Sequence, residues 1–193
     1  MPAGVDISAR RHRLTVHDYY RMAEVGILNA DHRVELIEGE IISMTPRGSR
    51  HAAAVDRLNH LLLPALSHRA IIRVQQPVRL GDLSEPEPDI AVVAIRSDFY
   101  ELAHPRPDDL YLLIEVADSS FQYDRDFKLP LYARHGVKEV WLVDIEAKTL
   151  RVSRSPAYAG YVQNFIAADL RRMMIESLAD VLLDLSNIFR RVW

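Results

Sequence analysis

The sequence contains no cysteine, and this absence excludes disulfide bonds, thiolate metal sites and cysteine nucleophiles. It lacks any run approaching the roughly 20 apolar residues of a membrane span, and its N-terminus has no apolar core of the kind a signal peptide needs. Glycine is scarce, at seven residues, and no glycine-rich phosphate loop exists, which argues against a nucleoside-triphosphate enzyme. We therefore expect a cytoplasmic protein without a membrane partner.

A strong excess of either charge is also missing. The formal net charge of −3 argues against bulk attraction to nucleic acid, so any phosphate contact has to come from a local basic patch. The 193 residues, 49% hydrophobic and 26% charged, match an ordinary globular protein that buries its core as one domain. We expect residues 1–13 to form a flexible, basic arm and residues 14–193 to form a single domain.

Hydrophobic periodicity and turn residues predict a mixed α/β fold, in which helices pack on a central sheet. Thr15 and Asp18 resemble a cap that opens a first helix, and Ser49 is the expected N-cap of a second helix, in which Pro64 should kink or shorten the far end. The Glu38-Gly39 pair predicts a tight turn between two strands. The expected helices span 15–23, 49–68, 123–136 and 177–193. The other expected strands span 70–80, 89–94, 110–117, 138–145, 148–155 and 161–167.

Three charged residues, Asp89, Glu115 and Lys128, lie in or beside apolar runs. A carboxylate next to a core strand carries a desolvation cost unless it meets a cation, a metal or hydrogen-bond donors. In the strand 110–117, Glu115 shares a face with Leu113 and Ala117, so it points away from the purely aliphatic face. If the strands of Asp89 and Glu115 are neighbours, the two acids can converge, and the helix carrying Lys128 can return over them.

This combination suits hydrolysis of a phosphodiester. Mg²⁺ prefers oxygen ligands and is usually held by one or two carboxylates together with substrate phosphate, so Asp89 and Glu115 would supply the pair. Lys128 would orient or activate the attacking water, or stabilise the developing charge. Each residue also has a purely structural reading, because Pro-Asp is common at strand starts and a helix lysine is usually solvated.

The segment 46–51 offers a second candidate site. It runs into the predicted N-terminus of a helix, where free backbone donors together with Arg47 and Arg50 could hold a phosphate. His51 could reach the metal site. An ordinary charged helix cap and a surface histidine are the alternatives.

The order of these charged residues along the chain resembles the pattern of a known family. Pro88-Asp89, followed by Glu115 and a lysine, looks like the PD-(D/E)XK nuclease superfamily. The wider pattern resembles its Uma-two branch of restriction-endonuclease-like proteins. The resemblance covers roughly residues 14–144. Each segment that carries it is a weak signal by itself, but the segments in this order are specific for the family. These segments are LTVHDYY, VELIEGEI, PRGSRH, PEPDIAVV, LLIEVADSS and DRDFKLPLYARHGVKEVWLVD.

The resemblance implies a restriction-endonuclease-like mixed sheet flanked by helices, a divalent-metal site with Mg²⁺ or alternatively Mn²⁺, and nuclease chemistry. One position departs from the superfamily pattern, because the usual lysine two residues after the second acid is replaced by Ala117. Lys128 is the natural substitute, as the resembling branch uses a lysine that has migrated to the following helix. Glu35 becomes a further candidate, either as a ligand or as an acid supporting the ligands.

Two function classes follow. The first is a Mg²⁺-dependent DNA endonuclease that acts as a homodimer, because cutting both strands of a duplex calls for two sites. The second is a catalytically silent nuclease-like fold that binds nucleic acid or another protein. The intact Asp89, Glu115 and Lys128 favour the first class, whereas the acidic overall charge and Ala117 favour the second.

Overall fold

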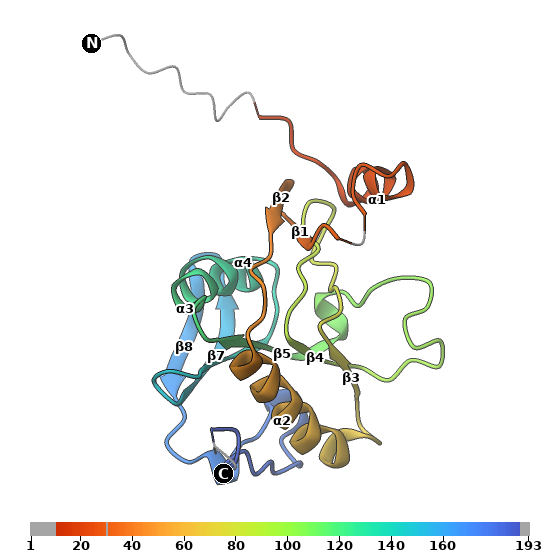
Figure 1. Ribbon diagram of the computed structural model, residues 1–193. Helices are drawn as coiled ribbons and strands as arrows, with labels where there is room; N and C mark the ends of the chain where they lie inside the picture. Colours follow the sequence, from red (N-terminus) through yellow and green to blue (C-terminus); the bar gives the residue numbers. More distant parts are fainter. Residues whose placement is uncertain (1–10, 30, 190–193) are drawn as a thin grey trace, which may run out of the picture.

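A six-stranded mixed sheet forms the centre of the protein in a computed structural model, which describes residues 11–29 and 31–189 (Figure 1). Only β5 and β6 are parallel, and all other neighbours are antiparallel. In their order across the sheet, the strands are β3 (Ile71–Val74), β4 (Ile90–Val93), β5 (Leu110–Ala117), β6 (Glu139–Asp144), β7 (Thr149–Ala157) and β8 (Gly160–Ile166). The predicted mixed sheet is confirmed.

Helices cover both faces of the sheet, as expected (Figure 1). One face carries α2 and the C-terminal segment, and the other carries α3, a π-helical turn (η3) and α4, which follow one another without a break. The helical elements are α2 (Ser49–Leu66), η2 (Pro107–Asp109), α3 (Phe121–Tyr123), η3 (Asp124–Lys128), α4 (Leu129–Arg134), η4 (Leu170–Arg172) and η5 (Glu176–Leu178). No helix in the described ranges is both long enough and apolar enough to cross a membrane.

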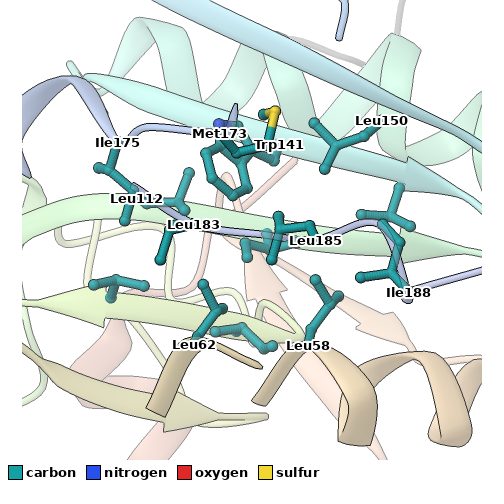
Figure 2. Close-up of a cluster of buried hydrophobic side chains, with 14 of the residues drawn as sticks. Leu58, Leu62, Leu112, Trp141, Leu150, Met173, Ile175, Leu183, Leu185 and Ile188 are labelled. Atoms are coloured by element: carbon teal, nitrogen blue, oxygen red, sulfur yellow. The ribbon is translucent and has the colours of Figure 1, made fainter. Parts of the chain in front are cut away.

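The larger core cluster lies between the sheet and α2 (Figure 2). Leu58 and Leu62 of α2 belong to the same buried cluster as Leu112 of β5 and Trp141 of β6, and all four are fully buried. The helical spacing of the buried positions in α2 is therefore the predicted one. In the apolar sequence pattern that predicts this helix, which is formed by Ala52, Val55, Leu58, Leu62 and Leu66, Ala52 alone departs from the predicted burial, because it is exposed.

The ends of α2 differ from the prediction. Its N-cap is Gly48, not Ser49, and no side chain caps the first turn. The helix continues through Pro64 to Leu66. Pro64 lies so close to the end that the hydrogen bond it removes does not interrupt the buried turns.

The predicted C-terminal helix over 177–193 is wrong for the described residues. This part of the chain contains only a 3₁₀ turn, η5, and an isolated bridge between Met173 and Leu183. Leu183 and Leu185 are both buried against the first face of the sheet, whereas Leu182 and Asp184 are exposed. The residues that contact the core thus alternate with a period of two, which an extended segment satisfies and a helix does not. Residues 190–193 lie outside the described residues.

A small second unit of structure packs beside the sheet. It consists of α1 (Val16–Glu24) and the antiparallel hairpin of β1 (Val34–Ile37) and β2 (Glu40–Ser43). The predicted capping box is present, because the Asp18 amide donates to Thr15 Oγ1 and the Thr15 amide donates to Asp18 Oδ2. The turn residues Glu38 and Gly39 have φ values of 49° and 79°, as expected for a two-residue hairpin turn. Residues 1–10 of the predicted arm lie outside the described residues.

Gly39 is the position where the hairpin tolerates no side chain. Its φ is positive, and a Cβ there would lie 2.5 Å from the Cβ of Arg13. Gly26 has almost the same φ, 78°, and a Cβ at that position would meet no atom within 4 Å. We predict that Gly39→Ala lowers the free energy of unfolding by more than the roughly 1 kcal/mol expected for backbone strain alone.

The matched control is Gly26→Ala, which should show only the backbone strain. Urea denaturation followed by far-UV circular dichroism measures both variants. Equal losses for the two variants would show that the contact with Arg13 does not constrain the turn.

Candidate functional site

A cavity of about 400 Å³ opens where β4 begins and β5 ends. Five charged residues with at most 6% exposure line it together: Glu35, Asp89, Glu115, Asp124 and Lys128. The structure therefore brings together the three residues Asp89, Glu115 and Lys128 that we singled out from the sequence. The further candidate Glu35, on β1 of the neighbouring hairpin, lines the same cavity.

The sheet register places the two acids opposite each other. Ile90 of β4 pairs with Ile114 of β5, so continuing the antiparallel register by one residue sets Asp89 opposite Glu115. Leu113 and Ala117, which alternate with Glu115, belong to the core cluster under α4. Glu115 therefore points to the face covered by α3, η3 and α4, as its alternation predicts.

Lys128 ends a π turn on the helical segment that covers this face. The Leu129 amide donates to the Asp124 carbonyl, five residues earlier, and the next residue, Pro130, has no N–H to donate to Asp126. Asp124 and Lys128, at the two ends of this turn, both line the cavity, where they are 5% and 6% exposed. Single π turns of this kind occur frequently at functional sites.

The Lys128 ammonium is the centre of the charged cluster. Its Nζ lies 3.3 Å from Glu115 Oε1 and 3.4 Å from Glu35 Oε2. Burial alone lowers the pKa of a lysine, but the surrounding carboxylates, above all Glu115 and Glu35, raise the pKa of Lys128 above its ordinary value. Lys128 therefore stays protonated at neutral pH.

Glu115 is the acid of the cluster for which ionisation is made much less favourable. Burial raises its pKa to about 8, and the nearby Asp124 and Asp89 carboxylates add to this effect, against the lowering influence of Lys128. Its Oε1 accepts hydrogen bonds from Tyr132 Oη and Lys128 Nζ, so this oxygen is fixed in place. Burial likewise raises the pKa of Asp124, although Ser120 donates a hydrogen bond to it.

Asp89 is held in its charged form. The Val116 amide donates to its Oδ2 over 2.9 Å, His51 Nε2 lies 3.0 Å from the same oxygen, and Gln75 donates to Oδ1 over 3.3 Å. Burial opposes ionisation, but the hydrogen bond and charge of His51 and the bond from Val116 outweigh it. The pKa of Asp89 is consequently lower than usual.

The predicted phosphate-binding residues lie around the same cavity. Arg47 and His51 line it, and Arg47 is paired with Glu87 at 2.8 Å. Arg50 is 56% exposed and lies 3.4 Å from Asp118, outside the cavity lining. Ala117, in the position of the superfamily's usual lysine, is fully buried in an apolar cluster, so an ammonium there would face no cavity.

Sequence reasoning missed several polar partners of the site. Tyr132 is fully buried among core residues, as its aromatic type suggests, but its hydroxyl also donates a hydrogen bond to Glu115. The spacing of four residues from Lys128 is the signal that could have revealed this role. Gln75 gave no comparable signal, because its left-handed backbone, with φ of 52°, is not readable from its residue type.

The fold and the cavity together define a class of protein. A mixed sheet with two acids on adjacent central strands, and a lysine against them, is a restriction-endonuclease-like nuclease fold. The chain belongs to the Uma2 family, which is described as "Putative restriction endonuclease" and whose family model matches residues 16–186.

A solved structure has the same fold. It is the crystal structure of a protein described as a "putative nuclease" from Anabaena variabilis, with a TM-score of 0.71 and 19% sequence identity. The similarity covers 91% of this chain and 97% of the other chain. A comparison with curated proteins found no match.

The raised pKa of Glu115 predicts a pH-dependent stability. Between its ordinary value of 4.5 and its folded value of about 8, the folded protein holds a proton that the unfolded chain has released. The free energy of unfolding should therefore fall as pH rises from about 5 to 8, by an amount on the order of a few kcal/mol. Glu115→Gln should flatten this profile, as measured by urea denaturation in metal-free buffer.

Asp126→Asn is the matched control. Asp126 is exposed on the same helical segment, and its pKa is lowered by a hydrogen bond from Arg125, so it does not titrate in this range. A wild-type profile that is flat between pH 5 and 8 would contradict the assigned protonation of Glu115.

Proposed function

We propose that the protein hydrolyses DNA phosphodiester bonds at this cavity, using Asp89, Glu115, Lys128 and Glu35. The observation that carries the proposal is the position of Lys128, whose Nζ lies within 3.4 Å of both Glu115 and Glu35 in the cavity that Asp89 also lines. The family description supports nuclease chemistry. Burying an ammonium together with several acids carries a desolvation cost, and a catalytic role would explain why the protein keeps this arrangement.

The donor set fits a divalent metal. Four buried carboxylates share the cavity with one buried lysine, and the pKa of Glu115 is raised to about 8 partly by its acidic neighbours. A cation would relieve this repulsion. In the described part of the chain, no three histidine or carboxylate side chains form a cluster that would hold a metal by themselves. Mg²⁺ needs only one or two carboxylates when substrate phosphate and water complete its shell.

We propose Asp89 and Glu115 as the ligands of Mg²⁺, with Mn²⁺ as the alternative. Each has one oxygen already fixed, since Asp89 Oδ2 accepts from the Val116 amide and Glu115 Oε1 accepts from Tyr132 and Lys128. When bound, the metal would supply a Lewis acid and lower the pKa of a water molecule. The protein residues supply the positioning.

Lys128 and Glu35 have complementary roles in this proposal. Lys128 keeps a fixed positive charge that orients a water or stabilises negative charge that develops on the phosphate. Glu35 accepts a hydrogen bond from the Glu87 amide over 3.1 Å, so it is held in place as a partner of Lys128. The protein therefore needs no nucleophilic side chain of its own.

The N-terminus of α2 favours a phosphate at the entrance. Gly48 and His51 line the cavity, and no side chain caps the first turn, which also contains no acidic residue. The free N–H groups and the helix dipole of this 18-residue helix attract an anion. Arg47 and Arg50 lie beside this end, which supports a role in holding the DNA backbone.

Metal-dependent nicking of a supercoiled plasmid tests the proposal. We expect wild-type protein to nick the plasmid in Mg²⁺ or Mn²⁺, and Asp89→Asn, Glu115→Gln and Lys128→Met each to lower the rate by about 100-fold or more. Glu35→Gln should reduce the rate less, because Lys128 keeps its contact with Glu115. Lys148→Met replaces an exposed lysine on a turn between β6 and β7 and should leave the rate unchanged.

Retained nicking in the Lys128→Met variant would refute the role assigned to this lysine. Circular dichroism spectra and melting curves for each variant establish that it is folded.

The partly exposed Arg50 allows a separate test of phosphate binding. Arg50→Ala should weaken DNA binding and reduce the slope of log K against log salt by roughly one ion contact, without changing the rate at saturating DNA. Arg171→Ala, in the exposed turn η4, is the control. Fluorescence anisotropy with a labelled oligonucleotide at several salt concentrations measures the slope. An unchanged slope for Arg50→Ala would remove this residue from the DNA contact.

A catalytically silent binding module is the second candidate function. The observation in its favour is that, in the residues described, no three metal-ligating side chains converge, and Lys128 already neutralises part of the acidic cluster. The plasmid assay separates the two functions. Oligonucleotide binding without cleavage in Mg²⁺ or Mn²⁺ would favour the binding module.

We also propose that the protein acts as a homodimer when both strands of a duplex are cut, because each copy has one such cavity. β8 is an edge strand with three exposed apolar side chains, Val162, Phe165 and Ile166, and such an edge favours pairing with another chain. Sedimentation velocity at micromolar concentration measures the oligomeric state.

A further inference from the structure

A second cavity of about 370 Å³ adjoins the candidate active site. Glu35 and Glu87 line both cavities, so the two spaces meet at the same wall. The second cavity extends toward α1, where Tyr19 and Tyr20 line it, and its volume lies in the range of sites for small organic groups. A ligand bound by its phosphate at the first cavity would place an adjacent group at the second.

The two tyrosines form a rigid aromatic corner. Their ring centroids are 5.8 Å apart, and the ring planes meet at 75°. Tyr19 Oη donates to the Val34 carbonyl over 2.9 Å and Tyr20 Oη donates to Glu85 Oε1 over 2.6 Å, so both rings are anchored. The Tyr20 residue is nevertheless 40% exposed. An anchored and exposed ring is well suited to stacking with a flat ligand.

Glu85 adds an acceptor to the lining of this cavity. The residue is 3% exposed, and only its Oε1 is satisfied, by Tyr20. Its Oε2 is buried and has no hydrogen-bond partner among the residues that the structure describes. A buried carboxylate oxygen without a donor is unfavourable, and an N–H group of a ligand in this cavity would satisfy it once the Glu85 side chain turns that oxygen toward the opening.

We infer that the second cavity binds an unstacked nucleobase that carries an amino group, next to the phosphodiester held at the first cavity. This inference rests on the proposed nuclease function and specifies its substrate. The tyrosine corner provides the stacking surface, and Glu85 accepts from the exocyclic amine, as a glutamate accepts from N4 of cytosine. Glu35 and Glu87 form the wall between the base and the scissile phosphate.

The inference predicts the class of nucleic acid that is cleaved. A base must leave the stack to enter the cavity, which is costly in a fully paired duplex and least costly in single-stranded or mismatched DNA. Cleavage should therefore be faster in single-stranded DNA or beside a mismatch than in matched duplex.

Two pyrimidine nucleotides that differ at C4 and at the neighbouring N3 provide the binding test. dCMP has an amine at C4 and an unprotonated N3, dUMP has a carbonyl at C4 and an N3–H, and both have the same phosphate and sugar. With full-length protein in metal-free buffer, we expect dCMP to bind about tenfold more tightly than dUMP by calorimetry or NMR titration. Equal affinities, or no binding of either nucleotide, would overturn the inference.

Variants test whether the preference for dCMP over dUMP comes from the second cavity. Glu85→Gln should abolish the preference for dCMP, because the amide presents a donor as well as an acceptor, and Glu146→Gln, at an exposed position, should keep it. Tyr20→Ala should weaken dCMP binding by about 5- to 150-fold, whereas Tyr20→Phe retains the ring and should bind dCMP within a few-fold of wild type. A preference that survives Glu85→Gln in folded protein would refute the role of Glu85.

The inference and the proposed function can fail separately. If wild-type protein nicks plasmid in Mg²⁺ but does not distinguish dCMP from dUMP, the base site is refuted and the nuclease function stands. If dCMP is preferred but no metal-dependent cleavage occurs on single-stranded, mismatched or matched DNA, the nuclease function is refuted and the base site stands.

Discussion

The site depends on the ion pairs that the buried Lys128 ammonium forms with its acidic neighbours. Four carboxylates crowd the same cavity, and each carries a desolvation cost that grows with the charge of its neighbours. One lysine offsets part of this cost by lying between Glu115 and Glu35, which belong to the sheet and to the hairpin respectively. The same ion pairs therefore join two separate parts of the fold and leave negative charge in excess at the cavity.

The backbone of β5 supports both proposed metal ligands. Glu115 is part of this strand, and the amide of the next residue, Val116, donates to Asp89. The Asp89 carboxylate is consequently tied to the backbone of β5 directly beside Glu115. β5 is bordered by β4 and β6 and covered on both faces, so few other parts of the chain are as constrained. Such support by rigid elements is what a site for precise chemistry requires.

The sequence predicted the features that depend on local pattern. The alternation around Glu115 indicated the face of the sheet, the Glu38-Gly39 pair indicated the hairpin turn, and the apolar spacing around Leu58 indicated the helix. The prediction from sequence failed where two local patterns compete. The apolar residues near Leu183 fit a helix as well as an extended segment, and their burial against the sheet determines which of the two forms. Contacts between distant elements, such as that of Gln75 with Asp89, leave no local signal.

The site was predictable as a set of residues and not as a geometry. Because Ala117 occupies the position of the superfamily's usual lysine, Lys128 was the evident substitute. In the structure, the Lys128 ammonium does contact Glu115. The π turn next to this contact was invisible in the pattern, although Pro130 supplied part of its cause. Composition of a helix predicts its existence far better than its local winding.

Because Lys128 lies in a continuous helical segment, the site is sensitive to the length of that segment. Adding or removing one residue in a helix rotates everything beyond it by about 100°, which would turn Lys128 from the acids toward solvent or the apolar core. Surface loops elsewhere in the chain can gain or lose residues without this effect. Between Ser120 and Lys128, therefore, insertions and deletions should be scarce among relatives that keep the lysine here, even where the side chains themselves vary freely.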